Sequence, residues 1–352
     1  MIFKNYPWHI SDQPAVLKKA DKKLLRKGTS LSFLTLLWTN VAMFPFLFLK
    51  FLFKKNNAIN SINHLKSFYG LCVNLDKGSA QVDLVNELGV KSLQIRFYLS
   101  DMKNIDKYVE FAKSFGADKE IMICVIQSRS HIENHELLTS DIKIVFEKFS
   151  SISSEFMIGN AVNRIKWGFV TMEEYLHFFE TVQRSRDKYF PELKLIGSSV
   201  IDFEFHFTIR SLFNNYKIHF DRLATLLYVD RRGSPRNTQY GIFDLQNKIN
   251  FLDTIVKSSS KSENIIYITE VNWPLKNTAP YAPTSENECV SEDEYTNYMI
   301  EYFDIARKSG KIKKVFWHQL IAPGYGLVDN KEGLIRKMPQ FYAMKEMVAN
   351  AS

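Results

Sequence analysis

The sequence predicts an α/β fold in which eight parallel strands close into a (β/α)8 TIM barrel over residues 66–350. A basic and hydrophobic segment over residues 1–60 precedes it. Short β-branched or aromatic runs alternate eight times with amphipathic segments. Their combined length is close to the ~250 residues typical of such barrels. No Gly-rich phosphate-binding motif follows the first strand, which argues against an open nucleotide-binding sheet.

The composition supports a large folded core and locates the excess charge. The 352 residues are 45% apolar and 24% charged, which excludes a disordered chain. Only three cysteines are present, and we expect no disulfide framework, metal site or cofactor. Residues 1–55 contain ten Lys or Arg against two Asp, which accounts for the whole net charge of +8. The barrel is therefore neutral overall, and we expect no nucleic-acid partner.

The N-terminal segment is expected to associate with a membrane surface through residues 14–55. No charged residue lies between Lys27 and Lys50, a run long enough to cross a hydrocarbon layer of about 30 Å. The stretch 14–27 has the basic amphipathic pattern of a helix on anionic lipid. A core helix is the alternative, and spanning and in-plane arrangements both remain open. We expect a bacterial inner membrane, with the side undecided.

Each strand is predicted from a run of branched and aromatic residues, because parallel barrel strands are buried on both faces. The predicted strands cover residues 68–74, 93–99, 121–127, 156–162, 193–200, 223–229, 265–271 and 315–320. Each is followed by a helical pattern; in the sixth, Leu245, Ile249, Leu252 and Val256 share one face. The predicted helices cover residues 77–88, 105–115, 140–149, 172–189, 205–213, 243–256, 292–308 and 339–348.

Polar and aromatic residues gather where the predicted strands end. Active sites of such barrels are built at the C-terminal ends of the strands, so these side chains are expected to meet around one cleft. The central candidate is Glu270, which follows an apolar strand and precedes Trp273. The others are Arg96, Gln127, Asn160, Tyr228, Asp230, Trp273, Trp317, His318 and Gln319.

Two of these strands resemble those of retaining (β/α)8 glycoside hydrolases. The seventh, YITEVNWP, resembles their nucleophile strand, and the fourth, FMIGNAVNR, resembles their Ile-Gly-Asn-Glu-x-Asn motif. The resemblance implies a carbohydrate substrate and implies that Glu270 is the nucleophile. It further implies that Asn160 binds the sugar 2-hydroxyl. The eighth strand, VFWHQL, resembles the family's aromatic floor, which implies that Trp317 is the platform under the sugar.

One position departs from that family, because Ala161 occupies the place of the general acid/base Glu. Losing general acid catalysis typically costs a factor of about 10²–10⁴. Three explanations stay open: another proton donor, a leaving group such as phosphate that needs no proton, or a glycan-binding pseudoenzyme in polysaccharide or lipopolysaccharide metabolism. The possible donors are Asp202, Glu204, His318 and, as the preferred catalytic partner of Glu270, Asp230.

Basic loops around this face suggest an acidic ligand. Arginine forks bind carboxylates and phosphates, so Arg231 and Arg232 are expected to contact an acidic envelope glycan. Local ion pairs are the alternative explanation. The remaining basic residues are Arg129, Arg164, Lys166 and Arg236. A non-carbohydrate barrel enzyme that uses Glu270 as a proton-abstracting base is a third functional class.

Overall fold

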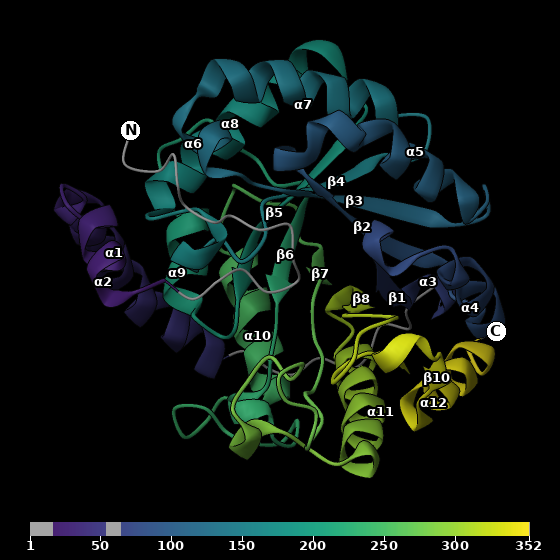
Figure 1. The fold of residues 1–352 in the computed structure, drawn as a ribbon. Coiled ribbons are helices and arrows are strands. Elements are labelled where there is room, and N and C mark those ends of the chain that lie inside the picture. The colour runs from purple at the N-terminus through teal and green to yellow at the C-terminus, as the bar shows by residue number, and fades with distance from the viewer. Residues whose placement is uncertain (1–16, 54–64, 352) are drawn as a thin grey trace.

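Eight parallel strands close into a barrel in chain order, which confirms the predicted fold class (Figure 1). The computed structural model describes residues 17–53 and 65–351, so the predicted helix over 14–27 lies partly outside the described residues. Val315 of the last strand pairs with Tyr69 of the first and completes the ring. The strands are β1 Tyr69–Val73, β2 Ser92–Tyr98, β3 Glu120–Ile126, β4 Glu155–Ile158, β5 Lys194–Ile201, β6 Arg222–Leu226, β7 Ile266–Ile268 and β8 Ile312–Trp317.

Several strands end earlier than the sequence predicts, and two of them, β4 and β7, lead into the site. β4 stops at Ile158 because Gly159 and Ala161 have φ of 83° and 46°, which turn the backbone out of the extended conformation. β7 pairs only through Ile268, although the predicted strand extends to residue 271. The segments beyond both ends run as loops at the mouth of the barrel.

The helices surround the barrel, and several begin at a side chain that caps the first turn. Asn134, Thr171 and Asp244 accept hydrogen bonds from the first backbone amides of α7, α8 and α10, and Ser291 with Glu294 forms a capping box on α11. Besides α1 and α2, the helices are α3 Leu65–Phe68, α4 Ala80–Leu88, α5 Ile105–Ser114, α6 Arg129–Glu133, α7 His135–Phe149, α8 Met172–Tyr189, α9 Phe205–Leu212, α10 Leu245–Val256, α11 Glu292–Lys308 and α12 Pro339–Ala349. A small hairpin, β9 Val328–Asp329 with β10 Arg336–Lys337, follows β8.

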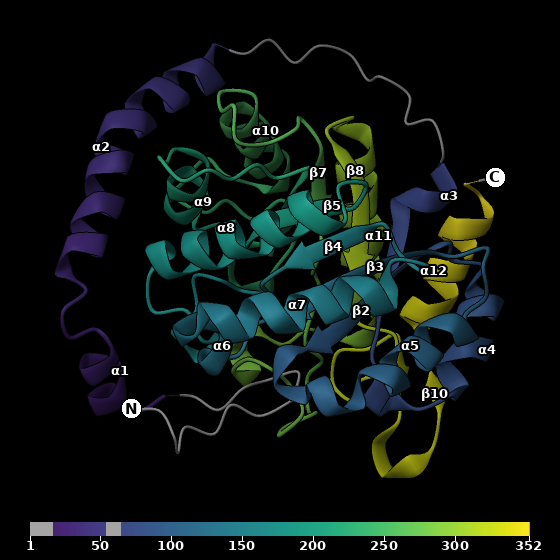
Figure 2. The ribbon, with the colours of Figure 1, turned by 90° about the horizontal axis from the view of Figure 1, so that it is seen from above.

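Two N-terminal helices lie outside the ring, and the second of them runs along the flank formed by α9 and α10 (Figure 2). They are α1 Lys19–Leu25 and α2 Ser30–Leu52. Within the described residues α2 alone is long and apolar enough to cross a membrane, with a mean hydropathy of 1.7 in its most apolar window. A core helix or a signal sequence passes the same test, so its packing is the more informative observation.

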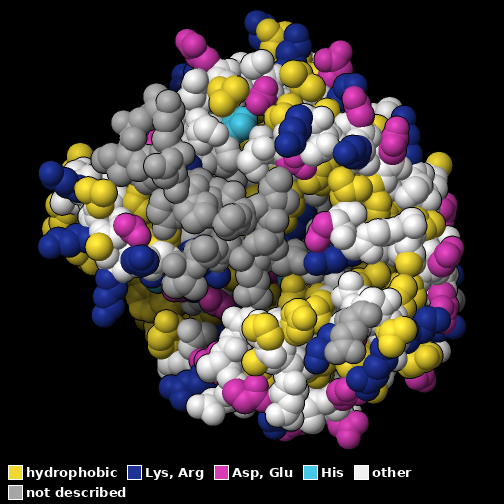
Figure 3. Space-filling view, in the orientation of Figure 1, with side chains coloured by type: hydrophobic (Ala, Val, Ile, Leu, Met, Phe, Trp, Pro, Cys, Tyr) yellow, Lys and Arg dark blue, Asp and Glu magenta, His cyan; other side chains and the backbone are white. Residues whose placement is uncertain are grey.

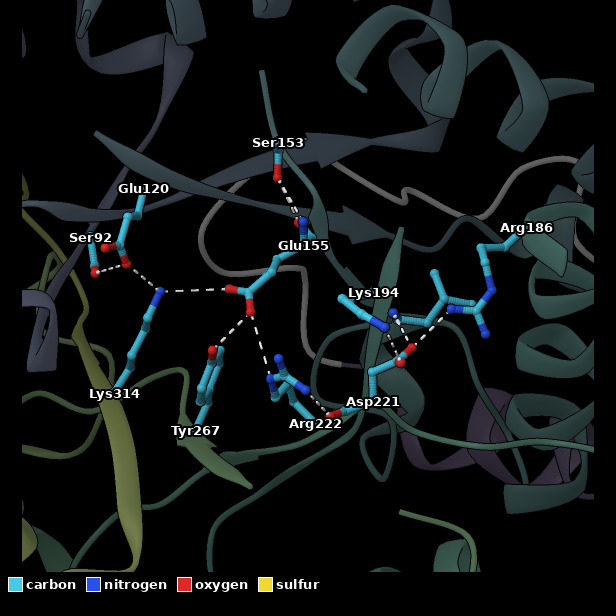
Figure 4. Close-up of polar contacts among 11 residues, drawn as sticks. Ser92, Glu120, Ser153, Glu155, Arg186, Lys194, Asp221, Arg222, Tyr267 and Lys314 are labelled. Carbon is cyan, nitrogen blue, oxygen red and sulfur yellow. Dashed lines mark hydrogen bonds and ion pairs between the residues drawn. The ribbon is translucent and has the colours of Figure 1, made fainter. Parts of the chain in front are cut away.

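The N-terminal end of the barrel is closed by charged side chains (Figure 4). Lys314 of β8 is buried and forms ion pairs with Glu120 at 2.8 Å and Glu155 at 3.6 Å. The Tyr267 hydroxyl donates a hydrogen bond to Glu155 at 2.8 Å. These contacts join β3, β4, β7 and β8 across the barrel. In such barrels this end serves stability, whereas chemistry is located at the other end.

A second group at this end is centred on Asp221, which precedes β6 (Figure 4). Its carboxylate accepts hydrogen bonds from Arg186 and from the Leu195 backbone amide, both at 2.9 Å. Lys194 lies 3.4 Å away. Burial by itself would raise the pKa of Asp221, but these donors hold it below its ordinary value. The ionised carboxylate therefore ties β5 and β6 to α8.

Asp221→Asn is expected to destabilise the barrel at neutral pH by about 1–3 kcal/mol, because Arg186 and Leu195 lose a charged acceptor. The pKa of Asp221 is lower in the folded chain than in the unfolded chain, where it is about 3.9. Its stabilisation is therefore present above that value and is lost as the pH falls through the folded pKa. Urea unfolding at neutral and acidic pH measures both effects.

Asp187→Asn is the matched control, since Asp187 also pairs with Arg186 but its side chain is 54% exposed. It should change stability by much less. A difference between wild type and Asp221→Asn that persists unchanged below pH 4 would contradict the ionic origin of the effect.

Candidate functional site

Glu270 lies two residues beyond β7, at the C-terminal end of the barrel. The chain stays close to the sheet here, because the Thr269 amide donates to the Thr225 carbonyl at 2.9 Å. The Glu270 side chain is only 7% exposed. The structure therefore places the predicted central carboxylate where the core meets the mouth of the barrel.

Two side chains from other strands hold this carboxylate. Arg96 of β2, 1% exposed, donates from Nη2 to Glu270 Oε2 at 2.5 Å. The hydroxyl of Tyr228, which follows β6, donates to Glu270 Oε1 at 2.6 Å. The two contacts fix both oxygens of one carboxylate from opposite sides of the barrel. Sequence analysis predicted all three residues for this site, and the structure brings them together.

The environment keeps Glu270 ionised. Burial would raise the pKa of Glu270, but the charges of His318 and Arg96 and the hydrogen bond from Tyr228 hold that pKa below its ordinary value. Burial and the neighbouring Glu270 charge raise the pKa of Tyr228 well above its usual range, so its hydroxyl remains a donor. At neutral pH the site therefore presents a carboxylate fixed in position.

A cavity of about 170 Å³ opens above Glu270. It is smaller than the roughly 300–1,000 Å³ pockets of drug-sized ligands, so it suits one compact group. Cations, acids and aromatic rings all contribute to its wall. The lining residues are Arg164, Lys166, Trp167, Ile201, Asp202, Tyr228, Arg232, Glu270, Asn272, Pro283, Thr284, His318 and Tyr325.

The β8 side of the cavity is formed by His318. Its ring stacks on Tyr325 with centroids 5.8 Å apart. Gln319 supports this pair from below the surface, because its Nε2 donates to the Tyr325 hydroxyl at 3.2 Å and its Oε1 accepts from Asn74. Gln319 is buried and does not line the cavity, so it positions Tyr325 rather than facing a ligand.

Gln127 also positions its neighbours, in this case through hydrogen bonds to the backbone. Its Nε2 donates to the carbonyls of Asn160 and Trp167 at 2.8 and 2.7 Å, and its Oε1 accepts from the Asn160 amide at 2.9 Å. These bonds shape the loop after β4. The ring of Trp167 lies 5.9 Å from the Arg96 guanidinium, at the cavity wall.

Asn160 and Ala161 are buried at the turn after β4. Both amide atoms of the Asn160 side chain lack a hydrogen-bond partner within the described part of the chain. Such groups are uncommon and often mark a functional site or an ordered water. Asn160 is absent from the cavity lining, so its expected contact with a ligand remains a prediction.

Trp317 and Trp273 do not lie where the sequence predicts them. Their indoles stack on one another, with centroids 5.8 Å apart, and neither is exposed. The Trp317 indole N–H donates to the Tyr295 hydroxyl of α11 at 2.8 Å, and its ring stacks on Phe303. Successive strand residues face opposite sides, so Trp317 faces the helices and His318 faces the cavity. Trp317 is therefore not a platform in this structure.

The structure distinguishes between the four possible proton donors. Asp202 lines the cavity but pairs with Arg164 at 2.5 Å. Glu204 pairs with the same guanidinium at 2.7 Å and is not a lining residue. Asp230 is also outside the lining, near the ammonium of Lys248. The geometry thus gives no support to Asp230 as the catalytic partner of Glu270. Of the four possible proton donors, His318 fits that role best, because it lines the cavity.

Local ion pairs account for half of the basic loop residues. Arg129 pairs with Glu133 and Glu174, both at 2.8 Å. Arg164 is neutralised by Asp202 and Glu204, and Arg236 pairs with Glu301. The alternative explanation for the basic loops is therefore correct for these three residues.

Lys166 and Arg232 differ from them, because both line the cavity and neither has an ion pair among the described residues. The Arg232 guanidinium lies 3.2 Å from the centroid of the Tyr228 ring, and its Nη1 is buried without a hydrogen-bond partner there. Burial lowers the pKa of Lys166, and the charge of Glu270 opposes that shift. Arg231 is exposed and lies outside the lining.

Sequence analysis missed several lining residues. Trp167 and Tyr325 come from loops after β4 and β8, and Asn272 lies two residues after Glu270. The sequence did offer a signal for Trp167, because an aromatic residue lies there beside basic loop residues. Nothing in the sequence marked Pro283 or Thr284, because they come from the loop between β7 and α11 and reach the cavity only through the fold.

The C-terminal mouth of the closed barrel thus combines a buried, ionised carboxylate with two cations that have no ion pair among the described residues. Charged groups perturbed in this way, at this end of such a barrel, mark a candidate functional site. Comparisons with known proteins agree at the level of fold. No family model matches the sequence, and no curated protein matches it.

Solved structures of glycoside hydrolases share the fold. A family 1 β-glucosidase from Thermotoga maritima superposes with a TM-score of 0.56 at 11% identity, over 79% of this chain and 87% of that one. A monomeric β-xylosidase from Caulobacter crescentus CB15 gives 0.57 at 13%, over 83% and 70%. A GH2 β-galacturonidase from Eisenbergiella tayi gives 0.54 at 12%, over 80% of this chain and 51% of that one. At these identities the likeness establishes the shared (β/α)8 fold.

Proposed function

We propose that this protein is glycoside hydrolase-like and acts on an acidic carbohydrate, with Glu270 as the nucleophile. The observation that carries the proposal is the carboxylate of Glu270, fixed through both oxygens by Arg96 and Tyr228 under a small open cavity. A carboxylate nucleophile must be ionised and correctly oriented before the sugar binds, and this environment keeps Glu270 both ionised and oriented.

In the proposed reaction, Glu270 attacks the anomeric carbon while the bond from that carbon to the leaving oxygen breaks. Retaining hydrolysis needs a second carboxyl group about 5–5.5 Å from the first to protonate that oxygen, and Ala161 cannot supply a proton. His318 lines the same cavity and carries the donor role in this proposal. A leaving group that departs as an anion, such as phosphate, needs no donor.

The acidic character of the ligand follows from Arg232 and Lys166. The buried and unpartnered Nη1 of Arg232 is a donor for a carboxylate or phosphate, and Lys166 adds a second charge. One of the solved structures with this fold is a β-galacturonidase bound to galacturonate, itself an acidic sugar. A uronic acid or phosphorylated sugar of the cell envelope fits this chemistry.

Ala161 favours a second candidate function, a glycan-binding pseudoenzyme in polysaccharide or lipopolysaccharide metabolism. Its methyl group is fully buried where the resemblance calls for the acid/base carboxylate. In this case Glu270 accepts hydroxyl hydrogen bonds from the sugar rather than attacking it. The same cavity and the same cations serve both functions.

We further propose that the N-terminal helices associate the barrel with a membrane. The length and hydropathy of α2 and the basic residues of α1 support this. A carbohydrate of the envelope is found at such a surface.

Glu270→Gln is expected to reduce turnover of a nitrophenyl uronide, whose leaving group needs no protonation, by roughly a thousandfold or more. Ligand affinity should change little, because the amide keeps the shape of the carboxylate. Steady-state kinetics and calorimetric titration measure the two effects. Glu263→Gln, at a side chain 58% exposed outside the cavity, is the matched control and should behave as the parent.

The parent protein itself distinguishes the two candidates. Binding without turnover in the parent selects the pseudoenzyme, in which Glu270→Gln alters affinity only. Turnover that survives Glu270→Gln would contradict the role of nucleophile, and a lack of glycan binding across an array of acidic and neutral sugars would contradict both functions.

Arg232→Ala is expected to weaken binding of an acidic oligosaccharide by roughly ten- to a hundredfold, the value of a charge-assisted hydrogen bond. Binding of the neutral reduced analogue should change much less. Arg231→Ala is the matched control, since Arg231 is the adjacent residue but is exposed outside the cavity. Equal losses for the two variants, or equal losses for acidic and neutral ligands, would rule out the anionic subsite.

A further inference from the structure

The two long faces of α2 have different environments. The inner face belongs to the barrel: Leu47 is fully buried, and Phe44 stacks on Phe205 of α9 with centroids 5.3 Å apart. About two turns after Phe44, the ring of Phe51 meets Phe251 of α10 at 5.5 Å. This side of the helix is therefore part of the folded core.

Polar contacts fix the same face. The Asn40 side-chain amide donates to the His206 carbonyl of α9 at 3.0 Å. The Lys50 ammonium donates to the Ser258 hydroxyl, just beyond α10, at 2.8 Å. Together with the phenylalanine contacts, these bonds attach the C-terminal half of α2 along the barrel flank.

The outer face of α2 carries an apolar stripe that no other described segment of the chain covers. Leu31 is 76% exposed, Leu37 is 56% exposed and Trp38 is 66% exposed. The stripe follows the helix at steps of mostly three or four residues over its 23 residues, about 35 Å. The exposed apolar residues of this face are Leu31, Leu34, Leu37, Trp38, Val41, Phe46, Leu49 and Leu52, followed by Phe53. Exposed apolar surface of this extent marks an interaction site.

The charges beside the stripe indicate what covers it. Exposed basic side chains of α1 and its flanks accompany the stripe at its N-terminal end, where basic and hydrophobic side chains gather over α1 and α2 in Figure 3. These residues are Lys18, Lys19, Lys23, Arg26 and Lys27. An anionic bilayer satisfies both features, since lipid headgroups neutralise the cations and the acyl region takes the apolar residues. A second copy of the chain would bring cations of the same sign.

We propose that α2 lies in the plane of an anionic membrane, with its outer face in the interface and the barrel seated on that surface through α9 and α10. This inference rests on the membrane association proposed above and chooses between the spanning and in-plane arrangements. A spanning α2 would carry the attached flank, with Lys257 and Ser258 at the end of α10, into the hydrocarbon, where polar groups are costly. In-plane binding leaves the inner contacts intact.

Flotation with vesicles of phosphatidylcholine, with and without phosphatidylglycerol, tests the binding face. The full chain should bind the anionic vesicles, and Leu37→Glu should reduce that partitioning roughly tenfold or more. Ile144→Glu, a matched change at a 38% exposed site on α7, should have no effect. A sedimenting dimer that Leu37→Glu disperses, without vesicle binding by the parent, would show that a second copy covers the stripe and would overturn the proposal.

Labelling distinguishes in-plane from spanning helices. The three native cysteines are buried, so Arg26→Cys and Lys66→Cys provide single reactive sites on either side of α2. In membrane vesicles from expressing cells, an impermeant maleimide should label both from the same side, with detergent-solubilised protein as the reactivity control. Labelling from opposite sides would overturn the in-plane arrangement while leaving membrane association intact. Recovery of the chain only in the soluble fraction would instead refute the association itself.

Discussion

The candidate site depends on one buried charge that the fold must stabilise. The charges of His318 and Arg96 and the hydrogen bond from Tyr228 keep Glu270 ionised. Arg96 and Tyr228 bind its two oxygens from β2 and from the end of β6, on either side of it. Removing a carboxylate from water is costly unless donors replace the solvent, and here both oxygens are satisfied from fixed strands. Only a closed ring brings these three positions together, so barrel closure and the state of Glu270 are linked.

The sequence predicted the barrel well because each parallel strand is apolar on both faces and each helix has one apolar face. It also identified Glu270, since a carboxylate directly after an apolar strand stands out. Sequence analysis failed where a shift of one position along a strand changes the side of the sheet that a side chain faces. Trp317 and His318 are adjacent, yet one packs among helices and the other lines the cavity. Asp230 was misplaced for a similar reason, because it begins a short 3₁₀ turn in which Arg232, two residues further on, lines the cavity and Asp230 does not.

The two ends of the barrel use charge differently. At the N-terminal end, Lys314 and Asp221 are each matched by oppositely charged partners, which gives stability and leaves no capacity for a ligand. At the C-terminal end, Arg232 and Lys166 are left without carboxylate partners among the described residues.

A crystal structure of the protein soaked with a uronic acid will locate the ligand relative to Glu270. The account predicts a sugar ring in the cavity, in contact with the Glu270 carboxylate and with its own carboxylate at Arg232 or Lys166. That result is expected whether the protein turns the sugar over or only binds it. A uronic acid bound elsewhere on the barrel, with Glu270 still satisfied only by Arg96 and Tyr228, would contradict it.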